Sequence, residues 1–310
     1  RELGQEMDDW RKDLTDTPPI LFLVVDCLRL DQWLAIEPLL REFFELKRFY
    51  HLSLIPTATP YSRNSIFSAM LPNELERLYP DLWDRGDEDE SSSNRMERQL
   101  LQKLLERRGI NLKPELRYLK ILHTDEAREL ERKINDYLQT PLTAVVYNFV
   151  DILVHTRQSE EVLKEIIPDE SAFRSVTRAW FPHSSLYAAL QAYARAKGIV
   201  ILTSDHGSLR VRKAIPVAGD RQTSSSLRYK FGRNLKLESK AALRIKNPSQ
   251  WGLPSRGINT EYIIAREENY FLYPNNFHHY ERLFTGSFQH GGISMEEMIL
   301  PVIVMKGKGY

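Results

Sequence analysis

The sequence has 310 residues, of which 42% are hydrophobic and 27% are charged, and its formal net charge is +1. This composition excludes a disordered or fibrous chain, and the near-neutral total predicts no general attraction to nucleic acid or to an anionic membrane. The single cysteine, Cys27, excludes a disulfide framework and favours a reducing compartment, so we expect a cytoplasmic protein. No apolar run reaches the roughly 20 residues that cross a bilayer, so membrane insertion is not expected.

Predicted strands and helices alternate along the chain. The run Pro19–Asp26 is apolar up to its final acid, which is typical of a strand buried on both faces of a parallel sheet. Further strands are expected at 49–55, 117–123, 144–150, 199–203 and 299–305. Helices are expected at 31–44, 62–70, 96–108, 127–138, 187–197 and 277–284. This alternation predicts an α/β sandwich with a central, mostly parallel sheet and helices on both faces.

Three segments depart from this alternation. Residues 1–17 are charged and helix-forming and start without Met, so we expect the end of a helical linker from an upstream domain, followed by one domain over 18–310. Residues 81–95 are acidic and serine-rich, which is typical of a solvated linker. Residues 208–273 are rich in Arg, Lys, Ser and Thr around short β-like pieces, and we expect an inserted cap subdomain there.

Acidic and histidine side chains form an ordered series near the ends of the predicted strands, with His290 just before the last strand. The series consists of Asp26, Asp151, His155, Asp205, His206 and His290. Polar sites in open α/β sheets form at the carboxyl ends of strands, so we expect these side chains to converge. Asp151 and His155 are four residues apart and would share one face of a helix. Each residue alone is explained equally well as a cap or turn, but the ordered series favours one joint site.

The ligand types in this series indicate the metal. Imidazole and carboxylate together suit zinc, with manganese as the second choice. Three aspartates and three histidines are enough for two dications. Paired metals suit phosphoryl transfer, because they clamp the attacking and the leaving oxygens.

The loop Pro56–Pro60 precedes an apolar helix and carries two hydroxyls, on Thr57 and Thr59. A hydroxyl at a helix N-terminus lies where backbone N–H groups and the helix dipole favour a phosphate or an alkoxide. Metal coordination would lower the pKa of that hydroxyl and make it a nucleophile. Arg63 and Asn64 are expected to bind the non-bridging phosphate oxygens. The residue pattern alone leaves open that either threonine only caps the helix.

The ligand series resembles, in its order, that of the alkaline phosphatase superfamily. The resemblance implies one metal held by Asp26, Thr59, Asp205 and His206, and a second held by Asp151, His155 and His290. Pro56-Thr-Ala-Thr59 is similar to the Pro-Thr-x-Thr turn of the nucleotide pyrophosphatase/phosphodiesterase branch. That similarity implies that Thr59, and not Thr57, is the nucleophile.

From Pro18 onward the sequence resembles a PglZ domain, most closely the effector domain of PorX-type response regulators. The resemblance is carried by Val25–Trp33, Tyr61–Met70 and Phe288–Glu297. It implies an upstream receiver domain and a phosphorylation-dependent homodimer. It also implies a role in regulating type IX secretion, with a sigma factor and a secretion-motor protein as partners.

The expected cap supplies Arg228, Lys230 and Arg233, interleaved with aromatic residues such as Tyr229. Such groups suit short single-stranded nucleotides, although a solvated loop surface explains them equally well. Few cations stand beside Thr59, which favours a singly charged phosphodiester over a dianionic monoester. We therefore expect a phosphodiesterase acting on short linear or cyclic oligonucleotides. Phosphomonoester hydrolysis, phosphate transfer and a zinc-stabilised signalling module without turnover remain alternatives.

Overall fold

The computed structural model describes residues 18–83, 96–219, 226–237, 240–255, 257 and 259–310. The expected helical stub at 1–17 and most of the expected acidic linker lie outside these residues. Within the described ranges, no helix combines the length and the apolar character that crossing a membrane requires.

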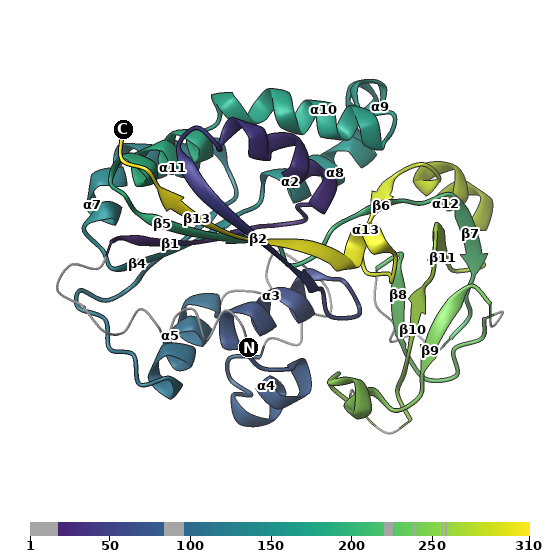
Figure 1. The fold of residues 1–310 in the computed structure, drawn as a ribbon. Helices are drawn as coiled ribbons and strands as arrows, with labels where there is room; N and C mark the ends of the chain where they lie inside the picture. Colours follow the sequence, from purple (N-terminus) through teal and green to yellow (C-terminus); the bar gives the residue numbers. More distant parts are fainter. Residues whose placement is uncertain (1–17, 84–95, 220–225, 238–239, 256, 258) are drawn as a thin grey trace.

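A six-stranded sheet forms the centre of the fold, in the order β2-β13-β5-β1-β4-β3 (Figure 1). Its strands are β1 (Ile20–Val25), β2 (Phe44–Leu52), β3 (Arg117–Ile121), β4 (Leu142–Tyr147), β5 (Ile199–Thr203) and β13 (Ile299–Gly307). The four strands β3, β4, β1 and β5 pair in parallel, and β13 is antiparallel to both of its neighbours. The predicted α/β fold with a mostly parallel central sheet is confirmed.

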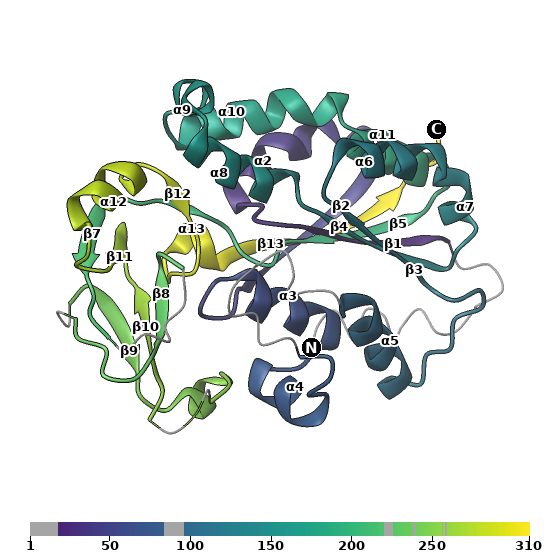
Figure 2. The same cartoon turned by 180° about the vertical axis from the view of Figure 1, so that it is seen from behind.

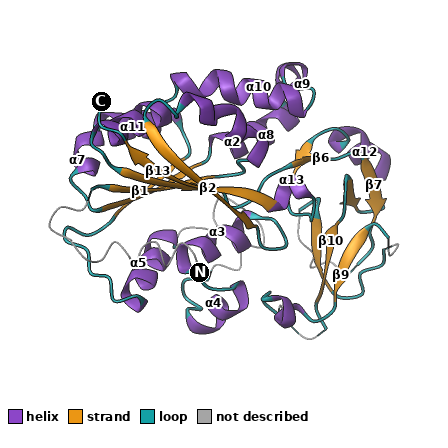
Figure 3. Cartoon of the chain, in the orientation of Figure 1, coloured by secondary structure: helices purple, strands orange, loops and turns teal. Residues whose placement is uncertain are grey.

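Helices cover both faces of this sheet (Figures 2 and 3). One layer contains α2 (Leu30–Ile36), α6 (Thr124–Arg132), α7 (Ile134–Leu138), α8 (Phe149–Ser159), α9 (Glu161–Ile166), α10 (Glu170–Trp180) and α11 (Ser185–Arg195). The other contains α3 (Thr59–Ser68), α4 (Pro72–Leu78) and α5 (Glu97–Arg107). A separate hydrophobic core lies between the sheet and each helix layer. Leu23 packs into the core on the side of α2 and α11, and Val24 packs into the core on the side of α3 and α5. Both faces of β1 are therefore buried, which explains why its sequence is apolar without alternation.

The second strand begins earlier than expected. The helix expected at 31–44 ends at Ile36, and the 3-10 helix η2 (Glu37–Leu39) follows it. Pro38 lies in η2 and has no backbone N–H to donate, so the regular α-helix is not continued. The chain then enters β2 at Phe44, because all nine residues of β2 pair with β13.

The described residues between β5 and β13 build three small sheets to one side of the central sheet (Figure 1). Their strands are β6 (Leu209–Arg210), β7 (Lys213–Pro216), β8 (Tyr229–Gly232), β9 (Ala242–Ile245), β10 (Glu261–Ala265), β11 (Asn269–Leu272) and β12 (Phe288–Gln289). We call residues 209–289, which include α12 (Phe277–Phe284), the small-sheet region. The short helices η3 (Phe181–His183), η4 (Pro248–Trp251) and α13 (Met295–Met298) complete the fold.

Candidate metal centre

The series of acidic and histidine side chains comes together as two neighbouring groups. Asp26 follows β1, and Asp205 and His206 follow the adjacent strand β5. These three form the first group. The second group consists of Asp151, His155 and His290. In each group the nitrogen and oxygen atoms suited to bind a metal all lie within 4.8 Å of one another.

Asp26 has one carboxylate oxygen held by protein donors and the other turned to the group. Its Oδ2 accepts hydrogen bonds from Arg63 Nη1 and, at 2.9 Å, from Asn148 Nδ2. Its Oδ1 is buried, has no hydrogen-bond partner in the described part of the chain, and lies 3.6 Å from His206 Nε2. An oxygen oriented in this way is suited to bind a cation.

Asp205 shows the same division between its two oxygens. Oδ1 accepts from the backbone N–H of His206 at 3.1 Å and from that of Cys27 at 3.3 Å. Cys27 adopts a φ of 63°, which is uncommon for a residue other than glycine. Oδ2 is buried 3.8 Å from His206 Nε2 and, among the described residues, receives no hydrogen bond.

The first group carries an excess of buried negative charge. Burial raises the pKa of Asp205 to about 7, and the neighbouring Asp26 carboxylate adds to this effect. Burial also acts to raise the pKa of Asp26, but the positive charge of Arg63 and the contact with His206 hold it below its usual value. Two adjacent buried carboxylates repel each other, and a bound dication would remove that repulsion. The donor set therefore fits a metal ion.

Thr59 lies against the first group at the start of α3. It is the first residue of the helix and is 3% exposed, and its Oγ1 lies 2.9 Å from His206 Nε2. His206 Nδ1 lies 3.2 Å from the carbonyl oxygen of Gly207. A carbonyl oxygen only accepts, so we assign the ring proton to Nδ1. Nε2 is then an acceptor that faces the threonine hydroxyl and both carboxylates.

Thr57 makes different contacts from Thr59. Its Oγ1 donates to the carbonyl oxygen of Gly292 at 2.8 Å and accepts from the N–H of Gly291 at 3.1 Å. The hydroxyl of Thr57 is thus bonded to the turn that follows His290, whereas the hydroxyl of Thr59 is bonded to His206.

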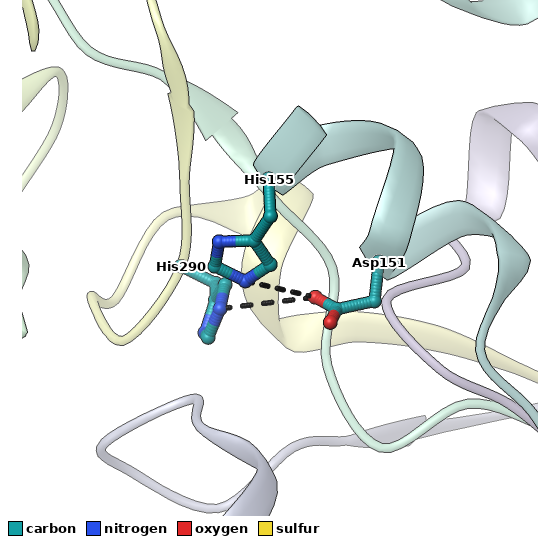
Figure 4. A group of neighbouring side chains, drawn as sticks. All are labelled: Asp151, His155 and His290. Carbon is teal, nitrogen blue, oxygen red and sulfur yellow. Dashed lines mark ion pairs between the residues drawn. The ribbon is translucent and has the colours of Figure 1, made fainter. Parts of the chain in front are cut away.

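The second group combines two residues of α8 with His290 from the segment after β12 (Figure 4). Asp151 Oδ1 lies 3.4 Å from His155 Nε2 and 3.9 Å from His290 Nε2. The side chain of His155 is 48% exposed, that of Asp151 16% and that of His290 5%. Burial and the neighbouring His206 lower the pKa of His290 to about 3, so its ring is neutral and able to bind a metal.

The two groups adjoin through a pair of histidines. The rings of His206 and His290 stack with their centroids 4.2 Å apart and an angle of 16° between their planes. One ring belongs to each group. The six side chains therefore form one continuous centre made of two candidate metal-binding groups.

Arg63 and Asn64 do not make the contacts expected from the sequence. Arg63 is 1% exposed and donates from Nε to Glu97 and from Nη1 to Asp26, and Nη1 also lies 3.9 Å from Asp205. Asn64 is also buried, and its Nδ2 donates to the carbonyl oxygen of Pro60 at 3.0 Å. Arg63 thus balances buried carboxylates, and Asn64 bonds to its own helix turn. The expectation that both bind phosphate oxygens stays a prediction.

Two of the three expected substrate-binding residues are buried. Arg228 is 0% exposed and paired with Glu297, so its expected role in substrate binding is corrected. Lys230 is 2% exposed, its Nζ lies 4.9 Å from the centre of the Tyr273 ring, and burial lowers its pKa to about 8. All four residues of β8 are buried, which explains why this stretch is not a charged surface. Arg233 is exposed.

Sequence reasoning missed three polar residues that support the centre. Asn148 orients Asp26, Glu97 pairs with Arg63, and Glu297 pairs with Arg228. The spacing Ser294-x-x-Glu297 is a capping-box signal, and the structure contains that box at the start of α13. Asn148 and Glu97 carry no such signal, because their partners are distant in the sequence.

Comparisons with known proteins identify the family and the fold of the chain. Residues 7–305 match the family model described as the BREX system PglZ alkaline phosphatase-like domain. No curated protein matches the sequence significantly.

Solved structures of one enzyme family share the fold. Murine ectonucleotide pyrophosphatase/phosphodiesterase 5 is similar with a TM-score of 0.62 at 13% identity, covering 93% of this chain and 88% of that one. An inactive variant of that protein in complex with AMP has a TM-score of 0.59 at 11% identity, with 94% and 88% covered. The human protein has a TM-score of 0.59 at 11% identity, with 92% and 87% covered. At these identities the likeness shows the fold alone, whereas the family match spans nearly the whole chain. The chain belongs to the PglZ family of alkaline phosphatase-like domains.

Proposed function

We propose that this chain is a metal-dependent phosphodiesterase that hydrolyses short linear or cyclic oligonucleotides through Thr59 and two zinc ions. The observation that carries the proposal is the 2.9 Å contact between Thr59 Oγ1 and His206 Nε2. It sets a hydroxyl at a helix N-terminus beside a group of side chains able to hold a metal. A hydroxyl in such surroundings is activated as a nucleophile.

The six side chains of the centre would hold the metals. The first metal would bind Asp26, Asp205 and His206 together with the Thr59 oxygen, and the second would bind Asp151, His155 and His290. Three imidazoles with three carboxylates suit zinc better than manganese. When bound, two dications would lower the pKa of the Thr59 hydroxyl and offset the charge that develops on the phosphoryl oxygens.

The chain's own residues supply the nucleophile and its orientation. Thr59 Oγ1 releases its proton to solvent and attacks phosphorus, one phosphoester bond breaks, and the leaving alkoxide takes up a proton from water. The residue before α3 is Ala58, which has no side-chain oxygen to cap the helix, so no side chain of that residue offsets the positive end of the helix dipole, which would favour a phosphoryl group bound at Thr59. Water then hydrolyses the phosphoester on Thr59 and restores the hydroxyl.

A phosphodiester suits the charge of the centre better than a monoester. Arg63, the cation next to Asp26, is already paired with two carboxylates. A diester carries one negative charge and needs less compensation than the dianion of a monoester. The mouse protein of similar fold was solved with AMP, which supports a nucleotide as part of the substrate. Arg233, which is exposed, is the basic residue proposed to contact it.

We further propose that the chain is the effector domain of a PorX-type response regulator in the cytoplasm. The support is the PglZ family match and the resembling stretches Val25–Trp33, Tyr61–Met70 and Phe288–Glu297. In this proposal an upstream receiver domain controls a homodimer by phosphorylation. A sigma factor and a secretion-motor protein of type IX secretion are its partners.

Metal analysis paired with substrate assays tests the proposed activity. The wild-type chain is expected to bind two zinc ions and to cleave linear or cyclic dinucleotides faster than simple phosphomonoesters. Thr59→Ala should reduce diester cleavage by roughly a thousandfold or more, whereas Thr59→Ser keeps a hydroxyl and part of the rate.

Other outcomes of this experiment favour the alternatives. Faster monoester cleavage indicates a phosphomonoesterase. Transfer of phosphate to an added alcohol indicates a phosphotransferase. Full zinc occupancy without any turnover of diesters, unchanged by Thr59→Ala, indicates a signalling module that uses zinc only for its structure.

A further inference from the structure

We infer that the turn after His290 is clamped by Thr57 on one side and by the Arg228–Glu297 pair on the other, and that this clamp positions His290 for metal binding. We call residues 290–294 the His290 turn. The inference rests on the proposed function in so far as His290 is taken to be a metal ligand. It gives Thr57, Arg228 and Glu297 positioning roles, since they act through the turn.

The first clamp is a single buried hydroxyl. Thr57 is 0% exposed, and its Oγ1 bonds the N–H of Gly291 and the carbonyl oxygen of Gly292. One side chain thereby satisfies two backbone groups of the turn. Removing the hydroxyl would leave both groups buried without a partner, which is unfavourable.

The second clamp is a buried carboxylate with four hydrogen bonds. Glu297 Oε1 accepts from the N–H of Gly292 at 2.8 Å and from Arg228 Nε at 3.1 Å. Its Oε2 accepts from the N–H of Ser294 at 3.0 Å and from Arg228 Nη2 at 2.6 Å. Both members of the pair are 0% exposed. Glu297 therefore ties the guanidinium of Arg228 to the backbone of the turn.

The glycines of the turn are required by the close approach of Arg228 and of Tyr229, the first residue of β8. A Cβ at Gly292 would collide with the guanidinium of Arg228. Gly291 has a φ of 108°, and a Cβ there would lie 2.7 Å from Tyr229 Cδ1. Glycine is the residue that tolerates both the conformation and the contact. The turn is thus packed directly against the small-sheet region.

Backbone hydrogen bonds join the turn to the same region. The N–H of Ile293 donates to the carbonyl oxygen of Ala265 in β10 at 3.1 Å. The N–H of Ala265 donates to the carbonyl oxygen of Arg228 at 2.7 Å, and Arg228 Nη1 donates to that of Glu267 at 2.7 Å. The position of His290 is therefore set by the small-sheet region, whereas Asp151 and His155 are carried by α8.

The two groups of metal ligands are held by different parts of the fold. The ligands of the first group follow β1 and β5, which are neighbouring parallel strands of the central sheet and pair from Ile20 with Ile199 to Val24 with Thr203. The second group is complete only when the His290 turn is held. Weakening the clamp is expected to release the second metal and to leave the first in place.

The number of zinc ions bound per chain tests whether weakening the clamp releases only the second metal. The variants are Glu297→Gln and Thr57→Val, with Thr57→Ser as the conservative rescue. The matched control is Glu261→Gln, which breaks the Arg244–Glu261 ion pair in the small-sheet region, away from the turn. After dialysis, the first two variants should hold one zinc ion, and wild type, Thr57→Ser and Glu261→Gln should hold two. Two zinc ions in both clamp variants would overturn the inference.

A second readout does not depend on metal. In the metal-free chain, acylation of His290 by diethyl pyrocarbonate is followed by peptide mass spectrometry, with His278, whose side chain is 90% exposed, as the internal reference. The clamp variants should raise the rate at His290 by about tenfold relative to Glu261→Gln, because local opening exposes the ring. Unchanged acylation rates at His290 in the clamp variants would contradict the clamp, whether or not the wild-type chain binds zinc. A wild-type chain that binds no zinc would contradict the proposed function and leave the acylation test of the clamp valid. If Glu297→Gln does not fold, the acylation rate at His290 is compared between Thr57→Val and Thr57→Ser, and a faster rate in Thr57→Val supports the clamp.

Discussion

The guanidinium of Arg63 donates a hydrogen bond from Nη1 to Oδ2 of Asp26, and both side chains are 1% exposed. The same guanidinium is bonded to Glu97, which also accepts from the hydroxyl of Tyr118. Burying these charges is tolerated because each carboxylate faces the cation. The arrangement holds Asp26 with its second oxygen turned towards His206.

Arg63→Met is expected to destabilise the chain strongly. It leaves Asp26 and Glu97 buried without their cation, and breaking such a pair by removing one partner costs about 3–5 kcal/mol. Urea unfolding measures the change. Arg98→Met is the control, because the Arg98–Glu115 pair is exposed on both sides and spans 3.9 Å. Equal losses in the two variants would show that Arg63 is not a structural counter-charge.

Asp205 makes the stability of the metal-free chain depend on pH. Its pKa is about 7 in the folded state against an ordinary value of 3.8, so between these values the folded state binds a proton that the unfolded state has lost. The stabilising contribution of Asp205 is therefore present below about pH 4 and is lost as the pH rises to about 7.

Urea unfolding in the presence of a chelator tests this dependence. Asp205→Asn is the reference, because it removes the titrating group and keeps the size of the side chain. Wild type should lose stability relative to Asp205→Asn as the pH rises from 4 to 7. A constant difference across this range would contradict the assignment.

The two metal positions should respond differently to a chelator. The first group is 0–1% exposed, whereas His155 in the second group is 48% exposed. We expect the zinc-loaded chain to release one metal quickly and the other slowly when it is diluted into EDTA. Metal content against time should show two phases, and His155→Ala should remove the fast one. A single phase in wild type would mean that the two positions are equivalent.

The sequence predicted the parts of the centre that depend on local pattern. Asp26 and Asp205 follow apolar strands, and adjacent parallel strands bring their carboxyl ends to one edge of the sheet. The spacing of Asp151 and His155 is local as well, because both lie on α8. His290 comes from the segment after β12, and the sequence placed it in the series because it lies just before the last predicted strand.

Long-range charge pairs could not be predicted in the same way. Arg228 is 69 residues from Glu297, and Arg63 is 34 residues from Glu97. A basic residue whose partner is so distant has the same local pattern as one on a solvated surface. Both arginines were therefore assigned to substrate or phosphate binding, and the structure buries both. The early start of β2 at Phe44 has a similar cause, since it is set by pairing with β13.

The most direct test of the account is whether Thr59 becomes covalently modified during turnover. The zinc-loaded chain is mixed with a dinucleotide, quenched in acid within a single turnover, and digested for mass spectrometry. The account predicts a nucleotidyl adduct on the peptide that contains Thr59, absent from Thr59→Ala. Rapid cleavage of the dinucleotide with no adduct on that peptide, at a rate that Thr59→Ala does not change, would contradict it.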